Sequence, residues 1–238
     1  MKEFSSFLEL GRKRIFEGLH DFSLNEVNEN DVCSIIFTSG TTGEPKGVML
    51  TQKSLMVDTV SACQNVWFTG ASMLTLPLHH TFAFTTGILV MLVYQKPIGI
   101  NKSLRTFRTD MQLFKPQNML LVPLYVETMY KSIWKTAKEQ KKVKLLKIMI
   151  ACSKLLRKCG IDIRRKLFRF ILTQFVGNLD LIISGGALLE QKYIDSMDAI
   201  GIQVLNGYGI TECYPVVAVN RNLYMKKGSV EFSRWNEA

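Results

Sequence analysis

The sequence alternates short apolar runs with longer segments of helical periodicity, and this alternation constrains the fold more than any other feature. Apolar runs of strand length occupy residues 32–38, 73–77, 118–123, 181–184 and 203–205. Segments with the length and periodicity of helices occupy residues 53–65, 82–93, 125–137 and 188–200. This order predicts an α/β fold, in which helices cover the faces of a parallel sheet. We expect the run at 32–38 to be a buried strand.

Composition is typical of a folded protein. Of the 238 residues, 47% are hydrophobic and 21% are charged, which excludes wholesale disorder. The five cysteines are odd in number and form no CxxC pair, and the three histidines do not recur with them at ligand spacing. This favours reduced thiols and argues against a zinc site. The longest apolar run, Ile88–Tyr94, is too short to span a bilayer, which needs about 20 helical residues. We expect a cytoplasmic protein, at most peripheral at the inner face of the membrane.

Basic residues concentrate in one segment. Residues 131–169 contain 14 Lys or Arg and two acids, so this segment's charge of +12 exceeds the +10 of the whole chain. One interpretation is a solvated basic helical pair. The other is an interfacial patch that contacts anionic membranes, since apolar residues interleave with the basic ones. Nucleic acid is not an expected partner, because aromatic interleaving and DNA-reading motifs are missing from the sequence.

A loop rich in glycine and hydroxyl residues follows the first apolar run. It spans Thr38 to Gly47 and contains Lys46. Glycines let backbone N–H groups approach phosphate oxygens, while hydroxyls and the lysine add donors and charge. The loop is not a Walker loop, because Pro45 precedes the lysine and Gly47 follows it. By itself it fits either a phosphate cradle or a flexible surface loop.

Three further segments accompany this loop: Leu76–His80, Ser184–Ala187 and Asn206–Glu212. Together the four resemble the motifs of the adenylate-forming superfamily, in the family's order. The glycine-rich loop resembles the phosphate-binding signature. The three further segments resemble the substrate-side histidine segment, the adenine-site turn and the second core motif. The details are most similar to bacterial long-chain fatty acyl-CoA synthetases. Acyl-carrier-protein ligases and fatty acyl-AMP ligases share much of this pattern. The resemblance covers about residues 32–230.

The resemblance implies a two-step reaction with ATP and Mg²⁺, and with coenzyme A as co-substrate. A fatty acid carboxylate attacks the α-phosphate of ATP to give acyl-AMP and pyrophosphate, and the thiol of coenzyme A then takes the acyl group. The first step is in-line displacement at phosphorus, which depends mainly on positioning and charge neutralisation.

The resemblance also implies a role for each matched residue. His80, Lys46, Thr211 and Glu212 would be catalytic, with His80 favoured over His79 as the histidine near the carboxylate and the α-phosphate. Glu212 and Thr41 would hold Mg²⁺, since a hard cation prefers oxygen ligands. The phosphates of ATP would lie against Thr38, Ser39, Gly40, Thr41, Thr42, Gly43 and Lys46. The adenine pocket and α-phosphate contacts would come from Gly185, Gly186, Ala187, Asn206, Gly207, Tyr208, Gly209 and Thr211.

The same resemblance divides the chain into parts. We expect a helical lead-in and connector at 1–30, a partial AMP-binding domain at 31–230 that includes the basic helical insertion 131–169, and a divergent tail at 231–238. The family's ribose-binding Asp, hinge and C-terminal lid domain should lie further along than this chain extends. We therefore expect the chain alone to be inactive. An alternative is a non-catalytic remnant that binds nucleotide.

Overall fold

The computed structural model describes residues 4–19, 27–39, 44–223 and 225–230. Within these residues, a central sheet has the strand order β4-β3-β5-β6-β7-β8. All neighbouring strands run parallel except β8, which is antiparallel to β7. The strands are β3 (Ser72–Leu74), β4 (Ile98–Ile100), β5 (Asn118–Leu121), β6 (Leu181–Ser184), β7 (Gln203–Tyr208) and β8 (Ala218–Val219). The predicted parallel α/β architecture is confirmed.

The central strands are buried on both faces, as expected where helices cover a parallel sheet. Every residue of β5 and β6 is buried. Successive side chains point to opposite faces. Met119, Ile182 and Val204 therefore pack into one hydrophobic core, while Ile183 and Leu205 pack into another.

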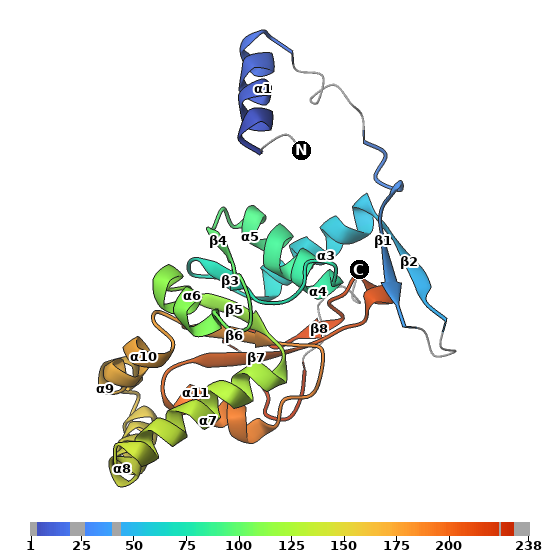
Figure 1. Ribbon diagram of the computed structural model, residues 1–238. Helices are drawn as coiled ribbons and strands as arrows, with labels where there is room; N and C mark the ends of the chain where they lie inside the picture. The colour runs from blue at the N-terminus through green and yellow to red at the C-terminus, as the bar shows by residue number, and fades with distance from the viewer. Residues whose placement is uncertain (1–3, 20–26, 40–43, 224, 231–238) are drawn as a thin grey trace.

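Helices form a layer on each face of the sheet (Figure 1). One layer contains α3 (Gln52–Asn65), α4 (Thr81–Phe84), the π-helical turn η1 (Thr85–Leu89) and α5 (Val90–Val93). The other contains α6 (Phe107–Phe114), α7 (Pro123–Glu139), α8 (Val143–Lys158), α10 (Arg169–Phe175) and α11 (Gln191–Ala199), with the short α9 (Arg164–Leu167) between α8 and α10. The four helices predicted from the sequence are all present.

Local sequence signals explain where two of these helices begin. Thr51 and Ser54 form a capping box at the start of α3, in which the Thr51 hydroxyl accepts from the Ser54 N–H and the Ser54 hydroxyl accepts from the Thr51 N–H. Pro123 occupies the first turn of α7, where its missing N–H costs nothing.

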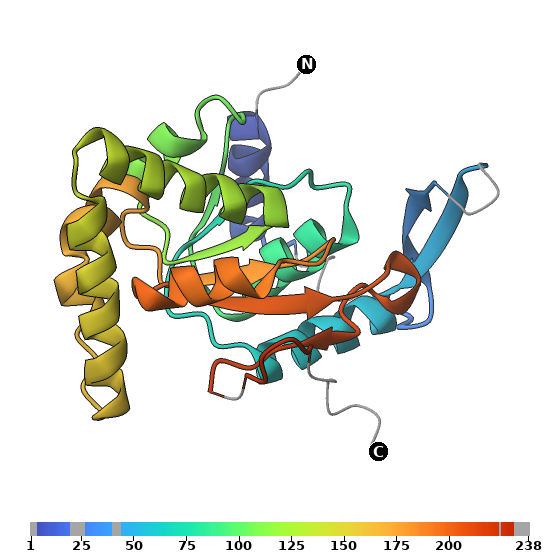
Figure 2. The same cartoon turned by 90° about the horizontal axis from the view of Figure 1, so that it is seen from below.

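The first predicted strand lies outside the central sheet. β1 (Val32–Thr38) pairs only with β2 (Lys46–Thr51), as an antiparallel hairpin that projects from the body (Figures 1 and 2). Ile35 and Phe37 are 56% and 72% exposed. The prediction of a strand at 32–38 is therefore confirmed, but the prediction that this strand is buried is wrong. An apolar run satisfies β-propensity without specifying which sheet it joins.

The lead-in and the basic segment are both helical. The lead-in contains α1 (Phe4–Phe16), and the basic segment 131–169 forms the end of α7, all of α8 and α9. Residues 20–26 of the connector and the tail 231–238 lie outside the described residues. Among the described helices, none is both long enough and apolar enough to cross a bilayer.

Candidate functional site

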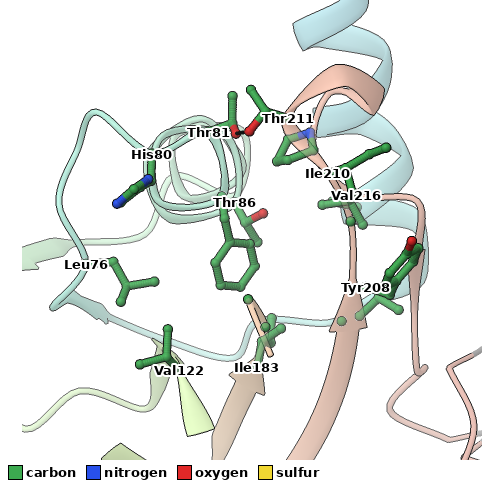
Figure 3. Close-up of a pocket in the computed structure, with 18 of the residues that line it drawn as sticks. Leu76, His80, Thr81, Thr86, Val122, Ile183, Tyr208, Ile210, Thr211 and Val216 are labelled. Atoms are coloured by element: carbon green, nitrogen blue, oxygen red, sulfur yellow. Dashed lines mark hydrogen bonds between the residues drawn. The ribbon is translucent and has the colours of Figure 1, made fainter. Parts of the chain in front are cut away.

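A cavity of about 410 Å³ opens at the carboxyl ends of β3, β6 and β7. Figure 3 shows Ile183 at its base, Leu76 and Val122 on one side, and Tyr208 and Val216 on the other. Helices α3 and α4 contribute further apolar and hydroxyl side chains. The cavity lies on the sheet face covered by α3, α4 and α5, at the edge where parallel α/β sheets bind ligands.

Three of the four sequence motifs meet in this cavity. Predicted site residues that line it are His80, Gly185, Gly186, Gly207, Tyr208, Gly209 and Thr211. They follow β3 and β6 or end β7, so strands far apart in sequence bring them together. These loops therefore share the carboxyl edge of the sheet.

Two of the lining glycines are required by close packing. A Cβ atom at Gly209 would lie 1.5 Å from the carbonyl oxygen of Pro215, which is backbone and cannot turn away. A Cβ atom at Gly185 would lie 3.0 Å from the ring of Phe82. The loop after β7 therefore folds back on itself tightly enough to fix the wall that carries Tyr208 and Thr211.

Hydroxyl groups connect the two sides of the cavity. The Thr81 hydroxyl, at the start of α4, donates to the Thr211 hydroxyl at 3.2 Å (Figure 3). Thr211 begins the 3₁₀ turn η2 (Thr211–Cys213), which ends at Tyr214 in the left-handed region with φ 71°. The hydrogen bond thus joins the loop after β3 to the loop after β7.

The paired histidines differ in position. Both are exposed, and their ring centroids are 4.5 Å apart. Only His80 lines the cavity, and it directly precedes α4. Figure 3 shows the His80 ring on the side of the cavity where Leu76 lies, apart from the Thr81–Thr211 pair, and His79 does not line the cavity.

Of the remaining predicted site residues, those that the structure describes do not line this cavity. Lys46 is exposed at the start of β2 and pairs with Thr38 at the end of β1, so Lys46, Thr38 and Ser39 lie at the same end of the hairpin. Glu212 is exposed beside Thr211. The Asn206 N–H donates to the side chain of Asn220 at 3.1 Å, and Ala187 is exposed. Gly40, Thr41, Thr42 and Gly43 lie outside the described residues. Within the described part of the chain, no three His, Cys, Asp or Glu side chains cluster as metal ligands would.

Two polar residues near the site were missed by sequence analysis. Thr86 is 4% exposed and lines the cavity, and its hydroxyl has no hydrogen-bond partner among the described residues. Asp58 of α3 is 6% exposed and accepts from the Val216 N–H at 3.3 Å, while its other oxygen has no partner among the described residues. Burial raises the pKa of Asp58 from 3.8 to about 8, and the Val216 hydrogen bond opposes this shift.

Comparison with known proteins gives a consistent family. The model of the family described as AMP-binding enzyme matches residues 6–236. Probable acyl-activating enzyme 16, chloroplastic, of Arabidopsis thaliana is 28% identical over 86% of this chain and 34% of its own length. Long-chain-fatty-acid–CoA ligase 1 of Saccharomyces cerevisiae is 27% identical over 88% of this chain and 32% of its own length. The Arabidopsis thaliana long-chain-fatty-acid–[acyl-carrier-protein] ligase AEE15, chloroplastic, is 26% identical over 80% of this chain and 32% of its own length.

Solved structures share the fold. The N-terminal domain of FACL13 from Mycobacterium tuberculosis matches with a TM-score of 0.58 and 19% identity, over 82% of this chain and 41% of that one. A malonyl-CoA ligase complex with methylmalonyl-CoA and AMP matches with a TM-score of 0.62 and 18% identity, over 87% of this chain and 39% of that one. The chain spans about a third of the length of the curated relatives it matches.

Proposed function

The chain belongs to the AMP-binding enzyme family, and on that premise we propose that it acts in the ATP-dependent activation of a fatty acid carboxylate to acyl-AMP and then to acyl-CoA. The observation that carries this proposal is the cavity at the ends of β3, β6 and β7, where three family motifs converge. We further propose that residues 31–230 form the AMP-binding domain, with the basic helices at 131–169 as an insertion.

In this proposal the chain's own residues bind and orient the reactants. Tyr208, which is 57% exposed at the cavity wall, stacks on adenine. Gly185 and Gly186 have no side chains, so the nucleotide can approach their backbone closely beside Tyr208. Ala187 and Asn206 complete this adenine pocket. Thr211 contacts the α-phosphate and is held toward Thr81 by their hydrogen bond.

The carboxylate oxygen attacks the α-phosphorus, and the bond to pyrophosphate breaks. His80 at the cavity rim orients the carboxylate or stabilises charge on the phosphorus oxygens. Lys46 and the loop from Thr38 to Gly43 bind the leaving phosphates. In the second step the thiol sulfur attacks the acyl carbonyl, and AMP leaves.

Glu212 has the chemistry that a magnesium site requires. Its carboxylate is exposed and adjoins Thr211, and Mg²⁺ is commonly held by one or two carboxylates together with substrate phosphates. Glu212, with Thr41, would hold the ion, which when bound neutralises charge on the phosphates.

Nucleotide binding tests this assignment. Equilibrium dialysis of the full chain with ATP and Mg²⁺ should give weak, Mg²⁺-dependent binding, and Lys46→Ala and Glu212→Ala should each weaken it by about tenfold, as expected for a charge-assisted contact. Lys102→Ala and Glu139→Ala are matched controls at exposed positions outside the cavity. Measurable binding that neither Lys46→Ala nor Glu212→Ala alters would contradict the roles of those residues.

Turnover by the chain alone is expected to be absent. Lys46 and Glu212 do not line the cavity, so the groups proposed for the leaving phosphates and the metal ion are not gathered around it. ATP–pyrophosphate exchange with palmitate should therefore be undetectable. Exchange at the rate of an ordinary synthetase would overturn this expectation.

The acyl acceptor has a second candidate. The similarity to AEE15, an acyl-carrier-protein ligase, favours a carrier protein as the alternative to coenzyme A. Coenzyme A and the thiol-bearing carrier protein can each be supplied to a form of the protein that makes acyl-AMP, which distinguishes the two acceptors. Thioester formation with only one of them identifies the acceptor.

We also propose that the basic segment contacts an anionic membrane face through α8. Leu145, Ile148 and Leu155 lie on one side of this helix and are 52%, 59% and 65% exposed. Lys144 and Lys147 lie on the same helix and form no ion pair with any described residue, whereas Lys131 and Lys135 on α7 pair with acids. Figure 2 shows α8 along the outer edge of the molecule, where a bilayer can reach it.

Liposome co-sedimentation tests this contact. Binding should require phosphatidylglycerol or phosphatidylserine and weaken with salt. Lys144→Gln with Lys147→Gln should reduce binding by about tenfold or more, because each lysine near an anionic surface contributes about 1 kcal/mol. Lys131→Gln with Lys135→Gln is the matched control. Equal binding to neutral liposomes, or no binding, would favour a solvated basic surface.

A further inference from the structure

A second cavity of about 380 Å³ lies on the opposite face of the central sheet from the candidate site. It is enclosed by α6, α7 and α10 and shares no lining residue with the first cavity. Its volume is within the range of small-molecule sites. Nothing in the adenylate chemistry proposed above uses it.

The interior of this cavity suits a flexible apolar chain. The rings of Phe107 and Tyr125 form one wall, with centroids 5.2 Å apart, and Phe175 lines another side. Met111 and Met129, which are 1% and 8% exposed, also line it. Methionine side chains adapt to irregular apolar shapes, so they can repack around an alkyl chain.

The mouth of the cavity is positively charged. Arg105 and Arg108 line it, and no carboxylate does. The nearby acids are engaged elsewhere: Glu127 pairs with Lys131 at 3.1 Å, and Asp110 accepts from the Asn101 side chain at 2.6 Å.

The two arginines can bind a further anion. Arg105 forms no ion pair with a described residue, and Arg108 has its guanidinium 5.0 Å from the Phe175 ring centroid. The one hydrogen bond of the Arg108 side chain in the described structure is long, 3.5 Å to the carbonyl of Gln174. Because a guanidinium has five N–H donors, most remain for a ligand. Planar donors of this kind bind carboxylate and phosphate well.

We propose that the α6–α7–α10 cavity binds a single-chain amphiphile with an anionic headgroup. The alkyl chain lies between Met111, Met129 and Phe175, and the headgroup is held by Arg105 and Arg108. The headgroup is a carboxylate or a phosphate, and the site is separate from the candidate catalytic cavity.

Methyl NMR of the full chain tests this site directly. With [methyl-¹³C]methionine, the signals of Met111 and Met129 are assigned from single Met→Leu variants. Dodecanoate and dodecyl phosphate, each below its critical micelle concentration, should shift both signals, and the tighter ligand identifies the headgroup. Met91, buried on the opposite face of the sheet, should not respond through this site. Dodecanol and dodecyltrimethylammonium should bind at least tenfold more weakly than the anions.

Two variants separate the headgroup from the chain. Arg105→Gln with Arg108→Gln should weaken anion binding at least tenfold while leaving the unliganded methyl spectrum unchanged, whereas Arg169→Gln, on the exposed surface of α10, should have no effect. Thr128→Trp, at an exposed position of the cavity mouth, should block both anions. The proposal is overturned if neither anion shifts Met111 and Met129, if dodecanol binds equally, or if the double arginine variant binds unchanged.

Discussion

The hairpin β1–β2 leaves Ile35 and Phe37 56% and 72% exposed, whereas the central sheet buries every residue of β5 and β6. Both regions carry family motifs that were recognised from sequence with equal clarity. The motifs on the sheet converge on one cavity, because parallel strands end at a common edge. The described residues of the motif on the hairpin, Thr38, Ser39 and those at 44–47, do not line that cavity. A motif therefore predicts a residue's position more securely when it adjoins a buried element.

The largest expected effect compares the same residue type in the two regions. Ile182 of β6 is 0% exposed, and Ile35 of β1 is 56% exposed. Ile182→Ala should lower the free energy of unfolding by about 2–5 kcal/mol, because it removes buried methyl groups and leaves a cavity. Ile35→Ala should change it by about 0.5 kcal/mol or less. Urea denaturation measures both, and equal losses would break the comparison.

A second prediction concerns α3, which follows β2 and also lines the cavity. The unfolded chain releases the Asp58 proton near pH 3.8, while the folded chain keeps it until about pH 8. The folded state thus binds more protons in this window, and stability should fall as pH rises from about 4 to about 8. Asp58→Asn should abolish that dependence and be more stable than the parent at pH 8.5, by on the order of a few kcal/mol.

Thermal unfolding at a series of pH values measures this effect. Asp31→Asn, at an exposed position, is the control and should keep the parent's pH dependence. An Asp58→Asn variant that is less stable than the parent at pH 8.5 would show that burial of the Asp58 carboxylate does not destabilise the folded state.

Two glycines, Gly207 in β7 and Gly209 directly after this strand, extend the comparison to single atoms. Gly209→Ala places a Cβ atom 1.5 Å from a backbone oxygen, so the loop must move at a cost of about 1–3 kcal/mol. Gly207→Ala meets nothing closer than 3.8 Å and should be tolerated. The melting temperature should fall only for Gly209→Ala. Similar behaviour of the two variants would mean that this wall is not rigid.

The smallest expected effect is that of the hydroxyl pair across the cavity. Thr81→Val and Thr211→Val each remove the 3.2 Å hydrogen bond. A double-mutant cycle should give a coupling energy of about 0.5–1.5 kcal/mol. Additive effects would show that the bond does not join the two loops.

Sequence analysis anticipated much of the fold and part of the site. The strands at 118–121 and 181–184 and the helices that follow them were predicted from short apolar runs and helical periodicity. The structure brings His80, Tyr208 and Thr211 together because parallel strands end at a common edge. The environment of β1 was not predictable, because an apolar run has the same local preference in a hairpin as in a buried sheet.

Buried polar residues on helices were the other gap. Thr86 and Asp58 give no sequence signal that distinguishes them from the other polar residues of the same segments. Their significance depends on burial without a full set of hydrogen bonds, which is a tertiary property. The cavity between α6, α7 and α10 was invisible for the same reason, since its arginines and methionines resemble ordinary surface and core residues.

Photolabelling with 8-azido-ATP and Mg²⁺, followed by mass spectrometry of the labelled peptides, tests the central claim most directly. The account predicts labelling at the cavity wall, in peptides that contain Gly185–Gly186 or Tyr208, and protection by a sulfamoyl analogue of a fatty acyl adenylate. Labelling confined to the lysines of α8 or to the hairpin, unaffected by that analogue, would contradict the assignment of this cavity as the nucleotide site.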